Sequence, residues 1–154
     1  MTSISSQIFP FRDDMDDQVR ERIICDIGRF FVQKSDLTAD VILVYVYGSF
    51  LTTDRFNDID IGILVSGERK PYDLFKYSML IASRVEQSFQ PRCEVDLRIL
   101  NGAPIRFLYE VIRTGRIVYA RDEEERIAFE ADVLTTYLDL LPMFEMMDQA
   151  LIAR

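Results

Sequence analysis

The chain has 154 residues, of which 49% are apolar and 29% charged, and its net charge is −8. This is the composition of a globular domain, and the negative charge argues against direct nucleic-acid binding, because phosphates are bound by clustered Lys and Arg. With two Cys and no His, a zinc site and Ser-His-Asp or Cys-His catalysis are disfavoured. Any bound metal should be a hard cation with oxygen ligands, such as Mg²⁺ or Mn²⁺.

A single domain is expected over residues 1–154, because no repeat, low-complexity segment or linker divides the chain. Residues 1–15 lack an apolar signal core and are expected to be loosely ordered. No stretch approaches the ~20 apolar residues of a membrane span, which predicts a cytoplasmic protein without membrane contact.

The hydrophobic periodicity predicts the elements in chain order. Apolar residues at helical spacing predict helices over 16–34, 72–89, 104–113 and 122–153. Alternating or continuous apolar runs predict strands over 41–47, 58–65, 93–100 and 116–120. Pro142 is expected to kink or end the last helix.

This order predicts an α/β (α+β) domain with a mixed sheet of about four strands and a long C-terminal helix. The helices are expected to pack on one side of the sheet, so that sheet and helices form a two-layer domain. The catalytic core would cover about residues 40–120, and the C-terminal helical segment residues 122–153.

Gly48 and Ser49 directly follow the first predicted strand. A glycine there lets the backbone turn sharply and lets a ligand approach without a Cβ in the way. If a helical turn follows, its N–H groups and the Ser hydroxyl face an anion such as a phosphate. A plain turn is the alternative, and it is the commoner outcome for an isolated Gly-Ser.

Asp58 and Asp60 interrupt an otherwise apolar strand. Side chains two residues apart on a strand point to the same face, so these carboxylates are expected to converge. Two adjacent anions repel each other unless they share a cation or a proton. A pair of divalent metals bound there would clamp a phosphoryl group that is being transferred.

Asp96 lies on the polar face of the strand predicted over 93–100. If this strand pairs beside 58–65, Asp96 faces the same cleft and completes a cluster of three carboxylates. A surface ion pair with Arg98, on the same face, is the alternative reading.

The order of strand, Gly-Ser, short loop, Asp-x-Asp strand, helix and Asp-bearing strand resembles the polymerase-β-like nucleotidyltransferase superfamily. The resemblance implies that Gly48 and Ser49 hold a nucleotide triphosphate. It also implies that Asp58, Asp60 and Asp96 hold two Mg²⁺ ions, with Asp96 as the base that deprotonates the attacking hydroxyl.

Residues 95–130 and the Tyr- and Leu-rich helix after them look like the minimal nucleotidyltransferases of the MntA type. That family implies an antitoxin in a hetero-oligomer with a HEPN-domain RNase toxin. It also implies transfer of AMP from ATP to a Tyr of the toxin. Two alternatives stay open: a small-molecule nucleotidyltransferase, as in aminoglycoside-modifying relatives, and an antitoxin that acts by binding alone.

The loop between the Gly-Ser pair and the first Asp departs from the family pattern. It has eight residues, Phe50–Asn57, which is shorter than usual, and it lacks the usual small residues. Arg55 in this loop is a candidate for triphosphate contact, as is Lys76 on the following helix. A solvated surface position is the more common role for such residues.

Several large apolar side chains follow Pro142, at Met143, Phe144, Met146, Met147 and Leu151. Met-rich surfaces suit adaptable docking of a partner. Packing against the N-terminal helix is the alternative, and the sequence slightly favours it.

Overall fold

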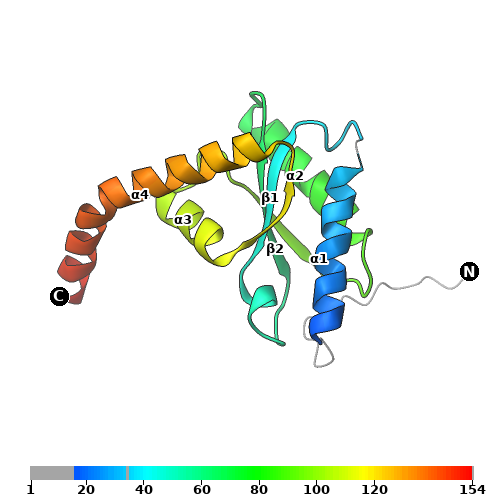
Figure 1. The fold of residues 1–154 in the computed structure, drawn as a ribbon, viewed down its shortest axis with the longest axis horizontal. Coiled ribbons are helices and arrows are strands. Elements are labelled where there is room, and N and C mark those ends of the chain that lie inside the picture. Colours follow the sequence, from blue (N-terminus) through cyan, green and yellow to red (C-terminus); the bar gives the residue numbers. More distant parts are fainter. Residues whose placement is uncertain (1–15, 34, 154) are drawn as a thin grey trace, which may run out of the picture.

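The structure, a computed structural model, describes residues 16–33 and 35–153, so the expectation for residues 1–15 lies outside the described residues (Figure 1). The elements in chain order are α1 (Asp17–Val32), β1 (Val41–Tyr47), the 3₁₀ turn η1 (Ser49–Leu51), β2 (Ile59–Val65), α2 (Pro71–Glu86), β3 (Val95–Ile99), α3 (Ile105–Thr114), β4 (Arg116–Ala120) and α4 (Glu123–Ile152). Each predicted helix and strand is confirmed, with shifts of a few residues at the ends.

Two of the helices begin at an aspartate that caps the first turn. The Asp16 carboxylate accepts a hydrogen bond of 2.8 Å from the backbone N–H of Val19, and Asp122 accepts one of 3.0 Å from Glu124 N–H. α2 begins with Pro71, which has no backbone N–H to leave unsatisfied in the first turn. These caps explain why the helices begin close to where the pattern predicts.

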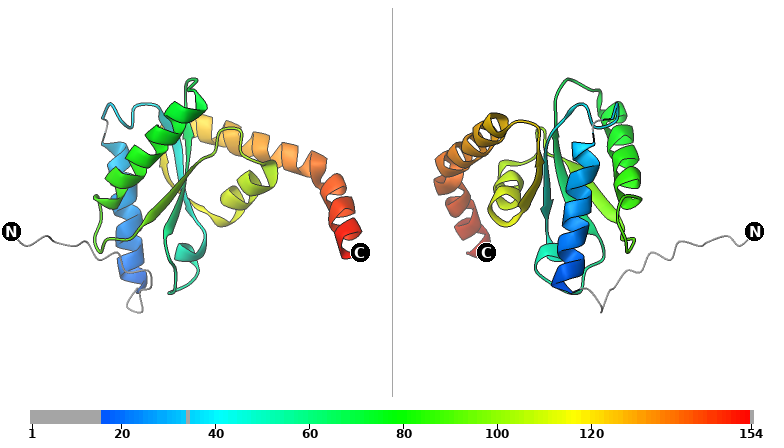
Figure 2. Two further views of the ribbon diagram at one scale, coloured as in Figure 1. Left: turned by 180° about the vertical axis from the view of Figure 1, so that it is seen from behind. Right: turned by 45° about the vertical axis from the view of Figure 1, so that its right-hand side comes forward.

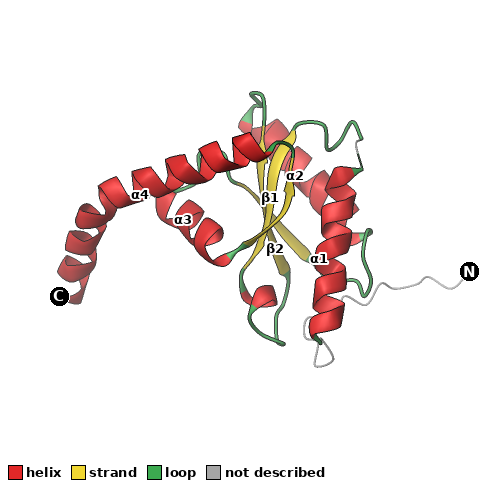
Figure 3. Cartoon of the chain, viewed as in Figure 1, coloured by secondary structure: helices red, strands yellow, loops and turns green. Residues whose placement is uncertain are grey.

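The four strands form one mixed sheet in the order β3-β2-β1-β4 (Figure 3). β1 pairs antiparallel with both β2 and β4, whereas β2 and β3 are parallel. The parallel pair requires a crossover connection, and α2 provides it. As a result, the start of β3 lies beside the start of β2.

Helices cover both faces of the sheet, so the expected two-layer arrangement is wrong. α1 and α2 pack on one face, through residues such as Ile27 and Ile81 against Ile61. α3 and α4 pack on the other, where Leu108 and Val133 share a core with residues of β1. Figure 2 shows the two helical layers on opposite sides of the strands. The reason is that β1 is apolar on both faces, and each face must be buried.

α4 continues through Pro142 and bends in its C-terminal part, which agrees with the expected kink (Figure 1). Phe144 is buried, but Met143, Met146, Met147 and Leu151 are 47–72% exposed. Packing of this segment against the N-terminal helix is therefore wrong, because α1 lies on the other face of the sheet. Within residues 16–33 and 35–153, no helix is both long and apolar enough to cross a membrane.

Candidate functional site

Three carboxylates converge at one end of the sheet, where β1 ends and β2 and β3 begin. Asp60 lies directly opposite Asp96 in the parallel β2–β3 pair, and Asp58 comes just before β2. One oxygen from each of the three carboxylates lies within 4.8 Å of the others. The expected cluster of three carboxylates is confirmed as geometry, and we call it the acidic triad.

The acidic triad lies on the same face of the sheet as α3. Ile59 and Ile61, which alternate with the aspartates along β2, are buried in the core under α1 and α2. The aspartates therefore point to the opposite face, because side chains alternate along a strand. All three are only partly buried, so the cluster is accessible from solvent.

Burial and the accumulated negative charge raise the pKa of one member of the triad, Asp60. Burial, together with the charges of Asp58 and Asp96, raises the pKa of Asp60 to about 6, against an ordinary 3.8. Arg98 opposes this shift and also approaches Asp96, with 3.7 Å between its guanidinium nitrogen and the carboxylate oxygen. Both interpretations of Asp96 are thus correct, because it joins the acidic triad and contacts Arg98.

The backbone at Gly48 touches the acidic triad. Its φ of 81° lies in the left-handed region, which favours glycine. A Cβ added at Gly48 would overlap with Oδ2 of Asp60. Ser49 then begins the turn η1, so the expected helical turn after the Gly-Ser pair is present. Gly48, Ser49 and the acidic triad therefore lie side by side.

Two residues that the sequence did not identify as candidates, Tyr47 and Arg20, also shape this region. The Tyr47 hydroxyl is buried and has no hydrogen-bond partner among the residues that the structure describes. Tyr47 lies opposite Asp60 in the β1–β2 pair, and burial together with the Asp60 charge raises the pKa of its phenol. Its ring packs edge-on against Phe107 of α3, at 5.6 Å between centroids. The Tyr47 side chain thus lies between the sheet and α3, close to the acidic triad.

Arg20 of α1 is the second missed residue, and it anchors the loop after η1. Its Nε donates to the carbonyl of Phe50 at 2.8 Å. Its Nη2 donates to the carbonyl of Thr53 at 3.1 Å and to the carboxylate of Asp54 at 3.0 Å. The Arg20 side chain is buried. A buried Arg that is paired with carbonyls 30 residues away gives no local sequence signal.

The structure separates the two basic residues that were candidates for triphosphate contact. Arg55 is exposed on the loop that links η1 to the acidic triad. Lys76 lies on α2, over the opposite face of the sheet, with its ammonium 5.0 Å from the centroid of the Tyr72 ring. The triphosphate contact considered for Lys76 is therefore contradicted, and the more common role at a solvated surface agrees with its exposure. The triphosphate contact of Arg55 stays a prediction.

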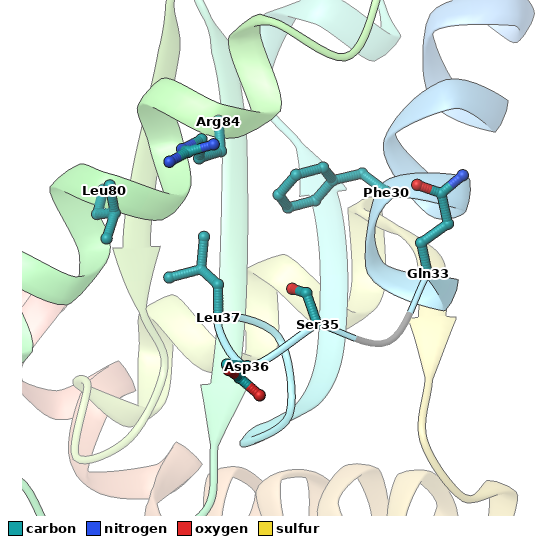
Figure 4. A pocket seen from close by; sticks show the side chains of 7 residues that line it. All are labelled: Phe30, Gln33, Ser35, Asp36, Leu37, Leu80 and Arg84. Carbon is teal, nitrogen blue, oxygen red and sulfur yellow. The ribbon is translucent and has the colours of Figure 1, made fainter.

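An open pocket of about 580 Å³ lies elsewhere, between the end of α1, the loop before β1 and α2 (Figure 4). Phe30 and Leu37 in its lining pack against the core on the α1 and α2 side. Since the loop precedes β1, this pocket is at the opposite end of β1 from Gly48. It has no carboxylate cluster, and we do not assign the chemistry to it.

The comparisons with known proteins point the same way as the geometry. The profile of the family described as "Polymerase beta, Nucleotidyltransferase" matches residues 29–124, a range that contains Gly48, Ser49 and the acidic triad. No curated protein sequence matches the chain.

Several solved structures share the fold. A chain of the tri-AMPylated Shewanella oneidensis HEPN toxin complex with MNT antitoxin is 17% identical, with a TM-score of 0.62, and the match covers 82% of this chain and 96% of that one. A toxin-antitoxin structure with AMP-PNP is 20% identical, with a TM-score of 0.62 and coverage of 86% and 98%. A toxin-antitoxin MntA-HepT structure is 19% identical, with a TM-score of 0.59 and coverage of 88% and 98%.

Proposed function

The chain belongs to the polymerase beta nucleotidyltransferase family, and on that premise we propose that it transfers AMP from ATP to a hydroxyl group of a protein acceptor. The observation that carries the proposal is the acidic triad, with its three carboxylate oxygens within 4.8 Å beside Gly48 and Ser49. A transfer of this kind needs negative charge to be offset at a phosphoryl group and a base to deprotonate the acceptor.

Asp58, Asp60 and Asp96 would hold two Mg²⁺ ions, and the donor set fits them. Its ligand atoms are carboxylate oxygens, which hard divalent cations prefer. The raised pKa of Asp60 indicates negative charge that is not fully compensated by nearby cationic side chains, and a cation would compensate it. When bound, the ions would neutralise phosphate charge and align the α-phosphate for displacement.

The other groups have separate roles in the proposal. Gly48 lets the backbone come close to the triphosphate, while Ser49 and Arg55 contact its oxygens. Asp96 accepts the proton of the acceptor hydroxyl as that oxygen bonds to the α-phosphorus and pyrophosphate leaves. Arg98, 3.7 Å from Asp96, keeps this carboxylate oriented toward the cluster.

We assign the acceptor to the class of HEPN-type toxins, with a Tyr hydroxyl as the modified group. The support is that solved structures with this fold include a complex of a tri-AMPylated HEPN toxin with an MNT antitoxin, and a toxin-antitoxin structure with AMP-PNP. The protein would then act as an antitoxin that modifies its partner in a hetero-oligomer.

The test is incubation with ATP, Mg²⁺ and the protein encoded by the adjacent gene, followed by intact-mass measurement. The partner should gain mass in units of AMP. Asp58→Asn and Asp60→Asn should each abolish the gain while circular dichroism stays unchanged, because the substitution removes a charge without changing the shape. Asp73→Asn, at an exposed position of α2, should transfer as well as the wild type. Undiminished transfer by the Asp58 or Asp60 variants would refute the proposed site.

A further inference from the structure

The outer face of α4 is unusually apolar for a solvent-exposed helix. Of the 13 large apolar side chains that are exposed among the described residues, eight are on α4. Ile127, Leu134 and Leu138 are 46–55% exposed and are spaced seven and four residues apart, so they lie along one side of the helix. An exposed apolar stripe of this length marks an interaction site.

The inner face of α4 is already used by the fold. Val133 and Phe144 are buried, and the Tyr137 ring stacks on Tyr109 of α3 at 3.7 Å between centroids. An open groove of about 470 Å³ lies between the two helices, and Ile112, Ile127 and Leu134 contribute to its lining. The groove and the stripe meet at Ile127 and Leu134, so together they offer one continuous apolar surface.

Around this surface, the charges without a partner among the described residues are acidic. Arg113 and Arg126 also line the groove, but Arg113 is paired with Glu110, and Arg126 with Glu123 and Glu130. Residues 127–153 contain five acidic residues and no basic residue. Glu130 is paired with Arg126 and Asp148 with Arg106. Asp132, Asp139 and Glu145 are exposed and form no ion pair within the part of the chain that the structure describes.

This charge distribution decides what kind of protein can cover the surface. A second copy of the chain would bring the acidic residues of one α4 against those of the other, with no Lys or Arg in residues 127–153 to compensate. Like charges in such a contact are destabilising. A partner with an apolar helix face flanked by Lys and Arg complements both the stripe and its charge.

We propose that the outer face of α4, with Ile127, Leu134 and Leu138 at its centre, docks a protein of that chemistry. The proposal rests on the proposed function, because this protein is the acceptor of the AMP group. α4 and the acidic triad are on the same face of the sheet, so a partner held along α4 lies on the side to which the triad opens. Docking there would raise the local concentration of the acceptor hydroxyl near the triad.

The experiment measures the binding of the full chain to the purified product of the adjacent gene by calorimetry. Leu134→Arg combined with Leu138→Arg should weaken binding at least about tenfold, because it removes two apolar contacts at the centre of the surface and the new charges would meet a basic rim. Both positions are exposed, so circular dichroism and thermal unfolding should stay unchanged.

A matched control is available on the other side of the sheet. Phe75 and Met79 of α2 are also four residues apart and are 61% and 58% exposed. Phe75→Arg combined with Met79→Arg adds the same charge to an equally exposed helix and should leave the dissociation constant within about twofold, well below a tenfold effect.

Unchanged binding by the α4 variant, equal weakening by the α2 variant, or no binding by the wild type would each overturn the docking proposal. A wild-type dimer in light scattering that the α4 variant dissociates would also overturn it, in favour of a second copy. Weakened binding without any AMP transfer by the wild type would support the docking surface and count against the proposed function alone.

Discussion

Asp60 is the residue on which most features of the site converge. It faces Asp96 across the parallel strand pair, lies against the backbone of Gly48, and is flanked by Asp58. Two of these contacts add negative charge, and the third limits the space for a side chain. A carboxylate in this position costs stability whenever it is ionised without a cation.

We therefore expect the stability of the cation-free protein to fall as the pH rises. The pKa of Asp60 is about 6 when folded and near 3.8 when unfolded. Between these pH values the folded state holds a proton that the unfolded state has released. The stability that protonated Asp60 gives the folded state is therefore complete below about pH 4 and is lost as the pH rises through about 6. Asp60→Asn should abolish this decline and be about 1–2 kcal/mol more stable at pH 7.5, allowing for solvent screening.

Urea denaturation at several pH values without divalent cations measures the effect. Asp132→Asn, which is exposed on α4, is the control and should follow the wild-type profile. Addition of Mg²⁺ at pH 7.5 should stabilise the wild type but not Asp60→Asn. A wild-type profile for Asp60→Asn would contradict this account.

At the scale of elements, the loop between η1 and β2 is held in place by two sets of contacts. Phe50 and Phe56 are buried and pack edge-to-face at 5.0 Å between ring centroids. Arg20 of α1 also donates to the carbonyls of Phe50 and Thr53. These contacts explain how a loop without the usual small residues keeps a defined path between Ser49 and Asp58.

Arg20→Gln should loosen this loop and destabilise the protein by about 1–3 kcal/mol, because charge-assisted hydrogen bonds to the carbonyls of the loop are lost. The affinity for ATP, measured by calorimetry, should fall severalfold, with partial recovery in Arg20→Lys. Arg22→Gln changes an exposed Arg of the same helix and should alter neither quantity. If ATP affinity does not change in Arg20→Gln, the loop conformation does not depend on this anchor.

At the scale of the whole molecule, the buried core and the proposed docking surface lie in different parts of the chain. The sheet is buried between two helical layers, with Ile61 fully buried near its centre. The end of α4 extends beyond these layers and exposes Met146 to 72% (Figure 1). After Pro142, Phe144 and Asp148 still contact Arg106 of α3, but the Met side chains of this segment are exposed to solvent.

The two regions should respond differently to truncation of a side chain. Ile61→Ala should lower the free energy of unfolding by about 2–5 kcal/mol, because it leaves a cavity in the core. Met146→Ala should change it by less than about 0.5 kcal/mol, since the side chain has few contacts to lose. Urea denaturation of the two variants tests this, and a large loss in Met146→Ala would show that the end of α4 is packed against the core.

The amino-acid sequence by itself determined the elements and the pairing of Asp58 with Asp60. Both depend on local rules: apolar residues at a helical or alternating period, and side chains two apart on one face of a strand. Apolar side chains on both faces of β1, such as Val44 and Tyr45, indicate that both faces of the sheet are covered. The expectation of helices on one side only did not follow from this pattern.

Only the tertiary structure decided the rest. The parallel pairing that places Asp96 beside Asp60, the anchoring of the loop by Arg20, and the approach of Gly48 to Asp60 all join segments distant along the chain or across a strand pair. Such contacts depend on which strands pair with each other. The apolar patterns of the four strands are similar, so they are compatible with several strand orders. The acidic triad was therefore foreseeable as a set of residues, but its closure within 4.8 Å was a property of the fold.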